Sequence, residues 1–130
     1  MTRRIGLITL VVSDYDAALA FYVGLLGFDL IEDTPQPGKR WVVVSPGDGG
    51  AALLLAQARG PAQEAAIGNQ TGGRVALFLE TDDFTGDHAR MLAAGVTFEE
   101  APRAEPYGRV AVWRDPFGNR WDLLERRPAS

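Results

Sequence analysis

The two halves of this 130-residue chain repeat one pattern at an offset of about 70 residues. Each half contains a glycine, a run dominated by apolar residues and then a proline-containing turn, at 38–46 and again at 108–116. Upstream segments match in the same order, because residues 10–15 correspond to 79–84. A repeat of this period predicts two copies of one supersecondary unit. Paired units create a cleft with equivalent positions facing each other, so the repeat also indicates where to look for a site.

Composition restricts the classes of partner. Hydrophobic residues make up 46% of the chain, which is enough to bury a core at this length. The net charge of −4, with both signs mixed along the chain, disfavours nucleic acid and anionic membranes, which require a basic surface. No apolar run is long enough to span a membrane, and no signal-peptide cleavage site is recognisable. The absence of cysteine excludes disulfides and thiolate chemistry. We therefore expect a cytoplasmic protein that binds neither nucleic acid nor membrane.

The first half predicts the element order β-α-β-β-β. Ser13 and Asp14 can cap the expected helix, and Gly27 is a natural helix stop. A Pro/Gly-containing turn is expected at 34–38. The expected strands are 5–12, 28–32, 39–45 and 51–57, and the expected helix is 16–26.

The second half repeats this order after a stretch with little pattern. That stretch, residues 58–73, is predicted to be a linker with a short helix starting at Pro61 and a glycine-rich joint at 68–73. We therefore expect a single domain over residues 1–130, with internal repeats at about 5–57 and 74–125. The expected strands of the second half are 74–81, 97–101, 109–114 and 120–125, and its expected helix is 83–94.

Several short motifs follow one another in a fixed order along nearly the whole chain. They are Val12–Asp16, Phe21-Tyr22, Leu26-Gly27-Phe28, Ala94-Gly95-Val96, Tyr107-Gly108 and Asp115–Trp121. Together with two βαβββ modules, this combination resembles the vicinal oxygen chelate superfamily of glyoxalases, bleomycin-resistance proteins and extradiol dioxygenases. The resemblance implies an α+β fold in which the two modules pair their sheets into a U-shaped cup. It also implies a homodimer, in some members with modules exchanged between subunits.

The resemblance further implies where a metal would bind. Metal-dependent members carry one ligand on the first and one on the last strand of each module, usually histidine, glutamine or glutamate. The corresponding residues here are Leu7, Leu54, Ala76 and Asp122, and of these only Asp122 could coordinate a cation. Glu80 lies on the same side of its strand as Ala76 and is the nearest additional carboxylate. We therefore expect no metal ligands of the family type and no other cofactor.

Aromatic and charged residues on the later strands are the candidate ligand-binding groups. Aromatic side chains that line a cup would bind a flat or apolar ligand, and an arginine could hold a ligand carboxylate or pair with Asp122. Alternation places Arg109 and Trp113 on one face of a strand, but it leaves open whether that face lines the cup or packs in the core. The candidate residues are Tyr107, Arg109, Trp113, Asp122, Glu80 and Trp41.

His88 is the only histidine, and it shares a helix face with Phe84 and Met91. It could serve as a general base near neutral pH. The alternative is a helix residue that is satisfied by a hydrogen bond or is partly exposed, and this is favoured because helices of the resembled family lie on the outer side of the sheet. The catalytic residues therefore stay unassigned.

The sequence favours a protein that binds a small organic molecule in the cup without the family's metal, for example by sequestration as in bleomycin-type resistance. The competing hypothesis is a metal-dependent lyase, isomerase or dioxygenase whose altered site is built from Asp122 and Glu80. A third is a dimeric module with no ligand of its own. The sequence favours a binding protein over an enzyme and leaves the identity of the ligand open.

Overall fold

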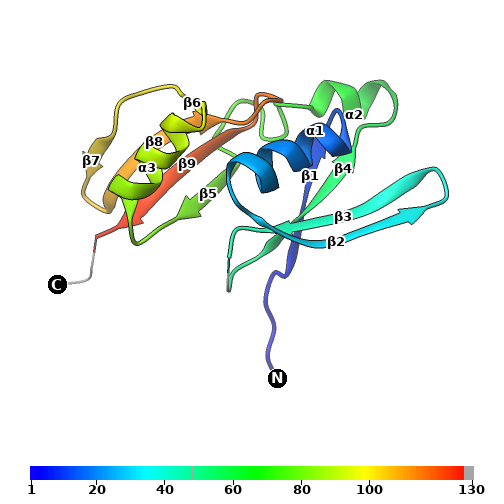
Figure 1. Cartoon of the computed structure of the whole chain (residues 1–130), viewed down its shortest axis with the longest axis horizontal. Coiled ribbons are helices and arrows are strands. Elements are labelled where there is room, and N and C mark those ends of the chain that lie inside the picture. Colours follow the sequence, from blue (N-terminus) through cyan, green and yellow to red (C-terminus); the bar gives the residue numbers. More distant parts are fainter. Residues whose placement is uncertain (48, 128–130) are drawn as a thin grey trace. The chain divides into compact units, whose positions relative to one another are not determined.

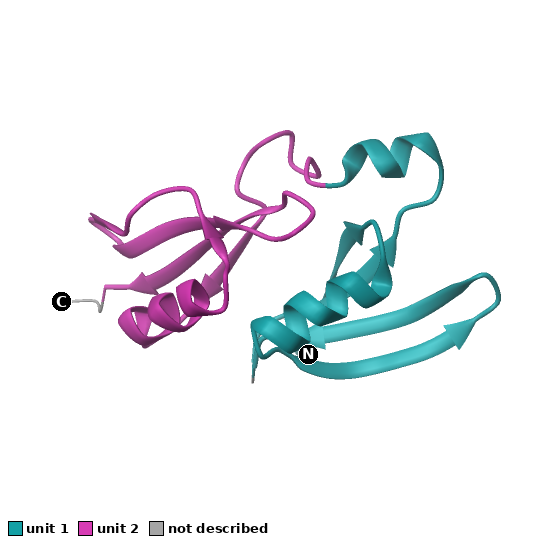
Figure 2. Cartoon of the chain, turned by 45° about the horizontal axis from the view of Figure 1, so that its top comes forward, with its two compact units in different colours: residues 1–67 teal, residues 68–130 magenta. Residues whose placement is uncertain are grey.

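The computed structural model describes residues 1–47 and 49–127 and divides into two compact units. Unit 1 comprises residues 1–67, and unit 2 begins at Gly68 (Figure 2). The division falls at the first glycine of the segment 68–73, which the sequence predicts as the boundary between the halves. Each unit has its own sheet and its own helix on one face of that sheet (Figure 1). The predicted α+β class is confirmed, while the pairing of the two sheets into a cup stays a prediction.

Unit 1 forms a mixed sheet with the strand order β1-β4-β3-β2. Strands β1 and β4 are parallel, and the other neighbours are antiparallel. In chain order the elements are β1 (Leu7–Val12), α1 (Tyr15–Leu19), η1 (Ala20–Leu25), β2 (Asp29–Gln36), β3 (Lys39–Ser45), β4 (Ala52–Gln57) and α2 (Gly60–Ala66).

The predicted helix at 16–26 forms as α1 followed by the wider turn η1. The carboxylate of Asp14 caps its start by accepting from the Ala17 N–H at 2.7 Å. In η1 the N–H of Leu26 donates to the carbonyl of Phe21 five residues earlier, which is the π-helical pattern. Gly27, with φ of 77°, then ends the helix, as expected from its freedom to adopt a left-handed conformation.

The helix of unit 1 covers one face of its sheet, which we call the helix-covered face. Arg40 identifies this face, because its guanidinium lies over the ring of Tyr15 at 5.2 Å. Side chains in phase with Arg40 form the core, and each is 4% exposed or less: Leu10, Val12, Val42, Val44, Leu53 and Leu55. The opposite, helix-free face carries Leu7, Trp41, Val43 and Leu54.

Unit 2 repeats this arrangement with a sheet of order β5-β9-β8-β6, in which β7 also pairs with β8. Strands β5 and β9 are parallel, matching β1 and β4 of unit 1. The elements are β5 (Leu77–Glu80), α3 (Phe84–Ala93), β6 (Thr97–Phe98), β7 (Arg103–Glu105), β8 (Gly108–Arg114) and β9 (Arg120–Arg126).

Two polar contacts tie α3 to one face of this sheet. Glu125 accepts a hydrogen bond from the Phe84 N–H at 2.9 Å, and Arg109 donates to the Thr85 hydroxyl at 3.0 Å. Trp113 and Trp121 lie on the same face, directly opposite each other in β8 and β9, and their rings stack at 4.9 Å. The tryptophan pair therefore belongs to the core between sheet and helix.

The turn at 115–119 is built around the buried carboxylate of Asp115. This carboxylate accepts from the backbone N–H groups of Phe117 and Asn119, both at 2.9 Å. It also accepts from the Asn119 side-chain amide at 2.7 Å. Asn119 in turn accepts from Gln70 at 2.9 Å, which fixes the start of unit 2 to the β8–β9 turn.

Several predicted boundaries are wrong. Strand β2 runs through Gln36, so the predicted turn at 34–38 begins too early. The reason is that β2 is an exposed edge strand, which shows no apolar alternation and tolerates Pro35. The strands expected at 74–81 and 97–101 shorten to β5 and β6, and the three-residue β7 was not predicted.

Candidate functional site

The four metal-ligand positions implied by the resemblance have the same strand register in both units. In unit 1, Leu7 pairs with Ala52 and Leu54 with Thr9, so Leu7 and Leu54 lie on the helix-free face of neighbouring strands. Unit 2 repeats this, because the Ala76 N–H donates to the Arg120 carbonyl at 2.8 Å and Phe78 pairs with Asp122. Ala76 and Asp122 therefore stand in unit 2 where Leu7 and Leu54 stand in unit 1.

The side chains at these positions do not fit the family's metal. Leu7, Leu54 and Ala76 carry no donor atom, which leaves the single carboxylate of Asp122. Among residues 1–47 and 49–127, no group of three or more His, Cys, Asp or Glu side chains is placed to hold a metal ion. We therefore derive no chemistry through a bound metal.

Asp122 is the most unusual polar residue on the helix-free face of unit 2. It lies in the middle of β9 and is only 7% exposed. Within the described part of the chain, its Oδ1 atom is buried and has no hydrogen-bond partner. Burial raises the pKa of its carboxyl, with the nearby Glu100 carboxylate acting in the same direction and Arg103 and Arg120 opposing it. A buried acceptor without a partner is rare in a folded protein and requires an explanation.

Apolar side chains surround Asp122 on the same face. Val112 is its direct neighbour in β8 and Phe78 its direct neighbour in β5. Val110 and Leu124 lie one alternation further along β8 and β9. Val110, Val112 and Leu124 are 6% exposed or less, whereas Phe78 is 59% exposed. These four residues form what we call the apolar floor.

Ion pairs surround the floor, and we call them the rim. Four arginines in β7, β8 and β9 lie on the same face as Asp122 and Val110. Each of them is paired with at least one carboxylate. The pairs are Arg103 with Glu100 at 3.0 Å and with Glu105 at 2.5 Å, Arg120 and Arg114 with Glu99 at 2.8 and 3.1 Å, and Arg126 with Glu80.

These ion pairs keep the rim residues charged. Hydrogen bonding to Arg120 holds the pKa of Glu99 below its ordinary value, and the same contact raises the pKa of Arg120. Glu105 and Glu100, with a smaller contribution from Tyr107, raise the pKa of Arg103. The rim therefore consists of fixed opposite charges around an apolar centre.

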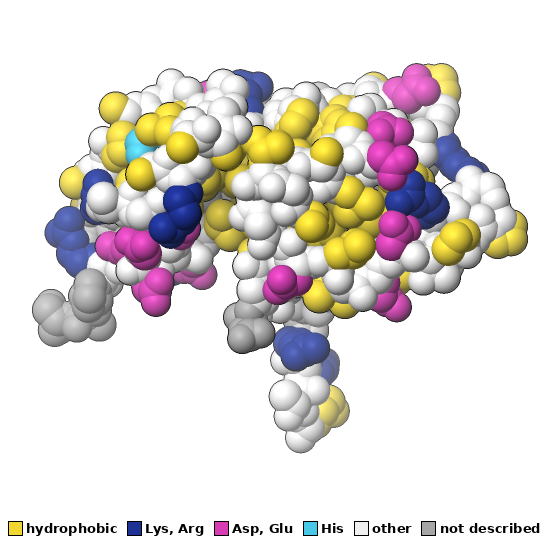
Figure 3. Space-filling model, viewed as in Figure 1, with side chains coloured by type: hydrophobic (Ala, Val, Ile, Leu, Met, Phe, Trp, Pro, Cys, Tyr) yellow, Lys and Arg dark blue, Asp and Glu magenta, His cyan; other side chains and the backbone are white. Residues whose placement is uncertain are grey.

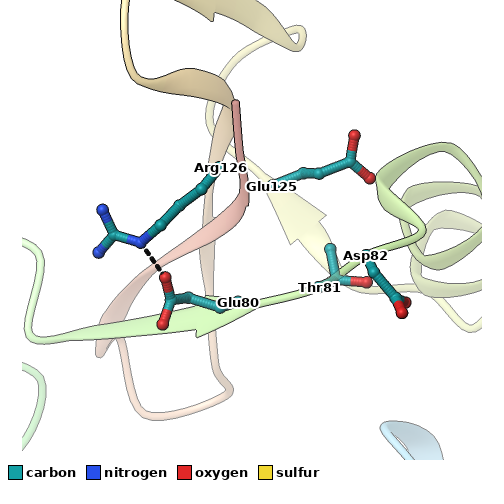
Figure 4. Close-up of a pocket in the computed structure, with 5 residues that line it drawn as sticks. All are labelled: Glu80, Thr81, Asp82, Glu125 and Arg126. Atoms are coloured by element: carbon teal, nitrogen blue, oxygen red, sulfur yellow. Dashed lines mark hydrogen bonds and ion pairs between the residues drawn. The ribbon is translucent and has the colours of Figure 1, made fainter. Parts of the chain in front are cut away.

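A hollow of about 460 Å³ lies at one end of this face, lined by Glu80, Thr81, Asp82, Glu125 and Arg126 (Figure 4). Glu80 from β5 and Arg126 from β9 point toward each other across it and form an ion pair. Glu125 comes from the other side of β9 and is directed toward α3 (Figure 4). The hollow therefore contains two rim residues, one of which is the predicted site residue Glu80.

The predicted binding residues lie on different faces of the sheets and in both units, so the structure does not bring them all together. Asp122 and Glu80 lie together on the helix-free face of unit 2. Tyr107 lies in the β7–β8 turn and is 47% exposed. Trp41 lies on the helix-free face of unit 1, where its indole N–H donates to Glu32 at 2.8 Å.

Arg109 and Trp113 lie elsewhere, on the helix-covered face of unit 2. Arg109 lies over the ring of Phe84 at 4.6 Å, and Trp113 has no exposed surface. Arg109 is therefore an exposed side chain held against α3, and Trp113 is packed between the sheet and α3. We leave them out of the candidate site.

His88 is also on the helix-covered side. Its ring lies 4.5 Å from the Phe98 ring and 5.8 Å from the Phe84 ring. The residue is partly exposed, which is one of the two alternatives that the sequence favours over a general base. Its ring contacts place it on the opposite side of the sheet from Asp122.

Sequence reasoning missed the rim residues Glu99, Glu100 and Arg103. Their signal is weak, because β7 is only three residues long and alternates charged residues with one alanine. The cluster of glutamates and one arginine at 99–105 could have suggested local ion pairs, but not their position over the floor. This position depends on the pairing of β7 with β8, which places Arg103 opposite Val110.

The surface carries charged side chains of both signs (Figure 3). On the face shown in Figure 3, basic and acidic side chains are interspersed and do not gather by sign. Within residues 1–47 and 49–127, no helix has the length and apolar character to cross a membrane.

Comparison with known proteins places this chain in a family. Residues 4–123 match the Glyoxalase/Bleomycin resistance protein/Dioxygenase superfamily. A protein of Shewanella frigidimarina, described as uncharacterized, is 56% identical over 96% of this chain and 95% of its own.

Two solved structures are also similar over almost their whole length. UcmS2 has a TM-score of 0.83 at 30% identity, covering 95% of this chain and 98% of its own. TnmS3, described as an antibiotic binding protein from a Streptomyces species, has a TM-score of 0.80 at 33% identity, covering 97% and 98%. With its fold, its repeated modules and its sequence all matching, this chain belongs to the Glyoxalase/Bleomycin resistance protein/Dioxygenase superfamily.

Proposed function

We propose that this protein binds a small organic molecule on the helix-free face of unit 2, over the apolar floor. The observation that carries the proposal is the Oδ1 atom of Asp122, which is buried among apolar side chains and has no hydrogen-bond partner among residues 1–47 and 49–127. A protein that only needed a stable sheet would place an aliphatic residue there, as unit 1 does with Leu54. A polar atom kept in such a place is suited to orienting a ligand.

The similarity to TnmS3 supports a ligand of this kind. That protein is described as antibiotic binding, and the similarity covers 97% of this chain. Antibiotics are organic molecules of the size that apolar pockets with a few polar groups accommodate. We therefore propose an antibiotic-like organic compound as the ligand class, with sequestration as the role.

Access to the floor requires rim side chains to move. Oδ1 of Asp122 is closed to solvent, and Glu100 and Arg103 are the long side chains whose charges act on it. They belong to the Arg103–Glu100 pair, in which both side chains are partly exposed. Partly exposed ion pairs contribute little to stability, so separating this one to admit a ligand costs little.

We propose that this binding needs no metal, since the family positions carry one carboxylate and three aliphatic side chains. The alternative is a lyase, isomerase or dioxygenase with an altered metal site at Asp122 and Glu80. Against it, Glu80 is already engaged by Arg126. Metal analysis of protein purified without chelator separates the two, because stoichiometric metal that is lost in Asp122→Ala would favour the enzyme.

We further propose that the protein is a cytoplasmic homodimer. Strands β1 and β5 are edge strands of their sheets, and Ile8 in β1 and Phe78 in β5 are 39% and 59% exposed. Exposed apolar edges of this kind are suited to association with a second copy. Light scattering after size-exclusion chromatography tests the dimer, and cell fractionation tests the location.

A melting screen against aromatic antibiotics tests the binding proposal. A ligand present at about 100 times its Kd should stabilise the protein by about 2.7 kcal/mol. Asp122→Ala should lose this stabilisation, while the matched control Asp29→Ala, on the exposed strand β2, should keep it. Equal stabilisation of wild type and Asp122→Ala would place the ligand elsewhere, and no stabilisation by any compound would count against small-molecule binding.

A further inference from the structure

The charges on the helix-free face of unit 2 restrict the kind of molecule that can bind there. We propose that its ligand presents a cationic or hydrogen-bond-donating group to Asp122 from a flat apolar body, and that anionic ligands are disfavoured. This inference rests on the proposed function and adds the chemical class of the ligand.

The first step is that the rim arginines are already engaged. Arg120 donates to Glu99 at 2.8 Å and to the Gly73 carbonyl at 2.8 Å. The Nε–H of Arg103 donates to both carboxylate oxygens of Glu100, at 3.0 and 3.1 Å, and its Nη1 group donates to Glu105 at 2.5 Å. Arg114 and Arg126 each pair with a glutamate as well. An anionic ligand would therefore have to share an arginine with a glutamate that already neutralises its charge.

The second step is that the rim carboxylates are also engaged. Glu99 is shared by Arg114 and Arg120, and Glu80 is bound by Arg126. Glu100 has a further partner, because it accepts from the Val112 N–H at 3.1 Å. This hydrogen bond ties Glu100 to the backbone of the floor strand.

The third step is the contrast with Asp122. Within the described part of the chain, its Oδ1 atom lacks the partner that each rim carboxylate has. The buried polar group left without a partner on this face is therefore an acceptor, and the group that complements it is an N–H or O–H donor. A cationic donor gives the stronger contact, because charge-assisted hydrogen bonds are stronger than neutral ones.

The fourth step is the repulsion that an anion would meet. A ligand carboxylate over the floor would lie near Asp122 and near Glu100, whose charge already acts on Asp122. Two like charges close together in an apolar setting repel more strongly than they do in water. The floor itself, with Phe78, Val110, Val112 and Leu124, favours a flat apolar body.

Three acridines of similar size and shape test the inference by fluorescence titration at neutral pH. They are 9-aminoacridine, which is a cation, acridine-9-carboxylate, which is an anion, and unsubstituted acridine. We expect 9-aminoacridine to bind about 10-fold more tightly than the carboxylate or better, as a charged hydrogen bond predicts. Asp122→Asn keeps the shape of the side chain and should remove most of this preference.

A second variant separates Asp122 from the rim. Arg120→Gln removes a rim cation but leaves Asp122 in place, so the preference for the cation should persist or increase. If Arg120→Gln abolished binding of the carboxylate while Asp122→Asn changed nothing, the rim would be an anion site and the inference would be overturned.

The outcomes also separate this inference from the proposed function. Binding of the carboxylate as tightly as 9-aminoacridine overturns the inference and leaves small-molecule binding intact. Failure of 9-aminoacridine to bind, while an antibiotic of the melting screen binds through Asp122, overturns the inference in the same way. If no acridine and no antibiotic binds, the proposed function fails and the inference fails with it.

Discussion

The guanidinium of Arg109 lies over the ring of Phe84, 4.6 Å from its centre. About 70 residues earlier, Arg40 lies over Tyr15 in the same way, at 5.2 Å. In each unit the aromatic residue is the first residue of the helix, α1 or α3. The arginine is the second residue of its strand, β3 or β8. The repeat therefore preserves a contact that fastens the helix to the sheet.

This contact predicts that Arg109 acts in stability and not in ligand binding. Arg109→Leu should lower the free energy of unfolding by about 0.5–1 kcal/mol, since an exposed cation–π contact contributes about that much. Urea unfolding measures the change, with Arg127→Leu as an exposed control. If the variant kept its stability but lost affinity for a ligand, Arg109 would belong to the site after all.

The two tryptophans at positions 113 and 41 should respond very differently to the same substitution. Trp113 is completely buried, so Trp113→Ala should cost about 3–5 kcal/mol of unfolding free energy. Trp41 is partly exposed on the helix-free face of unit 1, and Trp41→Ala should cost about 1–2 kcal/mol. Chemical denaturation of the two variants compares them directly. Similar costs would contradict the assignment of Trp113 to the core.

The sequence predicted the modules well because their buried strands carry clear signals. Residues 39–45 contain a continuous apolar run bounded by turns, and they form β3 with the same bounds. The repeat then transferred this order to the second half. The end of strand β2 was not predicted correctly, because the strand is exposed along its whole length and no apolar pattern marks where it ends.

The site was harder to predict because alternation groups side chains without saying which face the helix covers. Arg109 and Trp113 were correctly placed on one face, but that face is covered by α3 through the Glu125 and Thr85 contacts. Asp122 falls on the opposite face by the same alternation. That its Oδ1 atom lacks a partner among the described residues depends on three-dimensional packing, which no sequence pattern records.

Asp122 should make the protein less stable as the pH rises. Its pKa is raised in the folded state by burial, so the folded protein holds this proton more tightly than the unfolded chain does. The contribution of Asp122 to the free energy of unfolding is then highest below the unfolded pKa of about 3.9, and it falls as the pH rises through the folded pKa.

Asp122→Asn removes this dependence. Above the folded pKa the variant should be more stable than wild type, by about 1.4 kcal/mol for each unit by which the pKa is raised. The difference should shrink below about pH 4. Urea unfolding from acid to neutral pH measures it, and a variant that is less stable at neutral pH would show that the ionised carboxylate has a partner.

Glu99 should behave with the opposite sign. Hydrogen bonding to Arg120 lowers its pKa in the folded state, so its contribution is present above the unfolded pKa and is lost as the pH falls through the folded pKa. Glu99→Gln should therefore cost stability at neutral pH, by about 0.5–1 kcal/mol because the pair is partly exposed. The cost should disappear in acid. A cost that stays constant with pH would assign the effect to packing and not to charge.

Gly108 begins β8 in a conformation that a larger residue cannot adopt. Its φ is 150°, and a Cβ atom added there would meet the Glu125 carbonyl oxygen at 2.0 Å. Gly108→Ala should therefore cost about 1–3 kcal/mol of unfolding free energy. Because the collision involves the strand that contains Asp122, ligand affinity should fall as well.

Gly24 is the matched control for this substitution. It lies in η1, where an added Cβ atom meets nothing within 4 Å. Gly24→Ala should increase stability by about 0.5–1 kcal/mol, since alanine loses less conformational entropy in a helix. Thermal and urea unfolding of both variants should move in opposite directions. If Gly108→Ala proved as harmless as Gly24→Ala, β8 and β9 would not approach each other as closely at Glu125 as the structure indicates. The placement of β9 would then have to be revised.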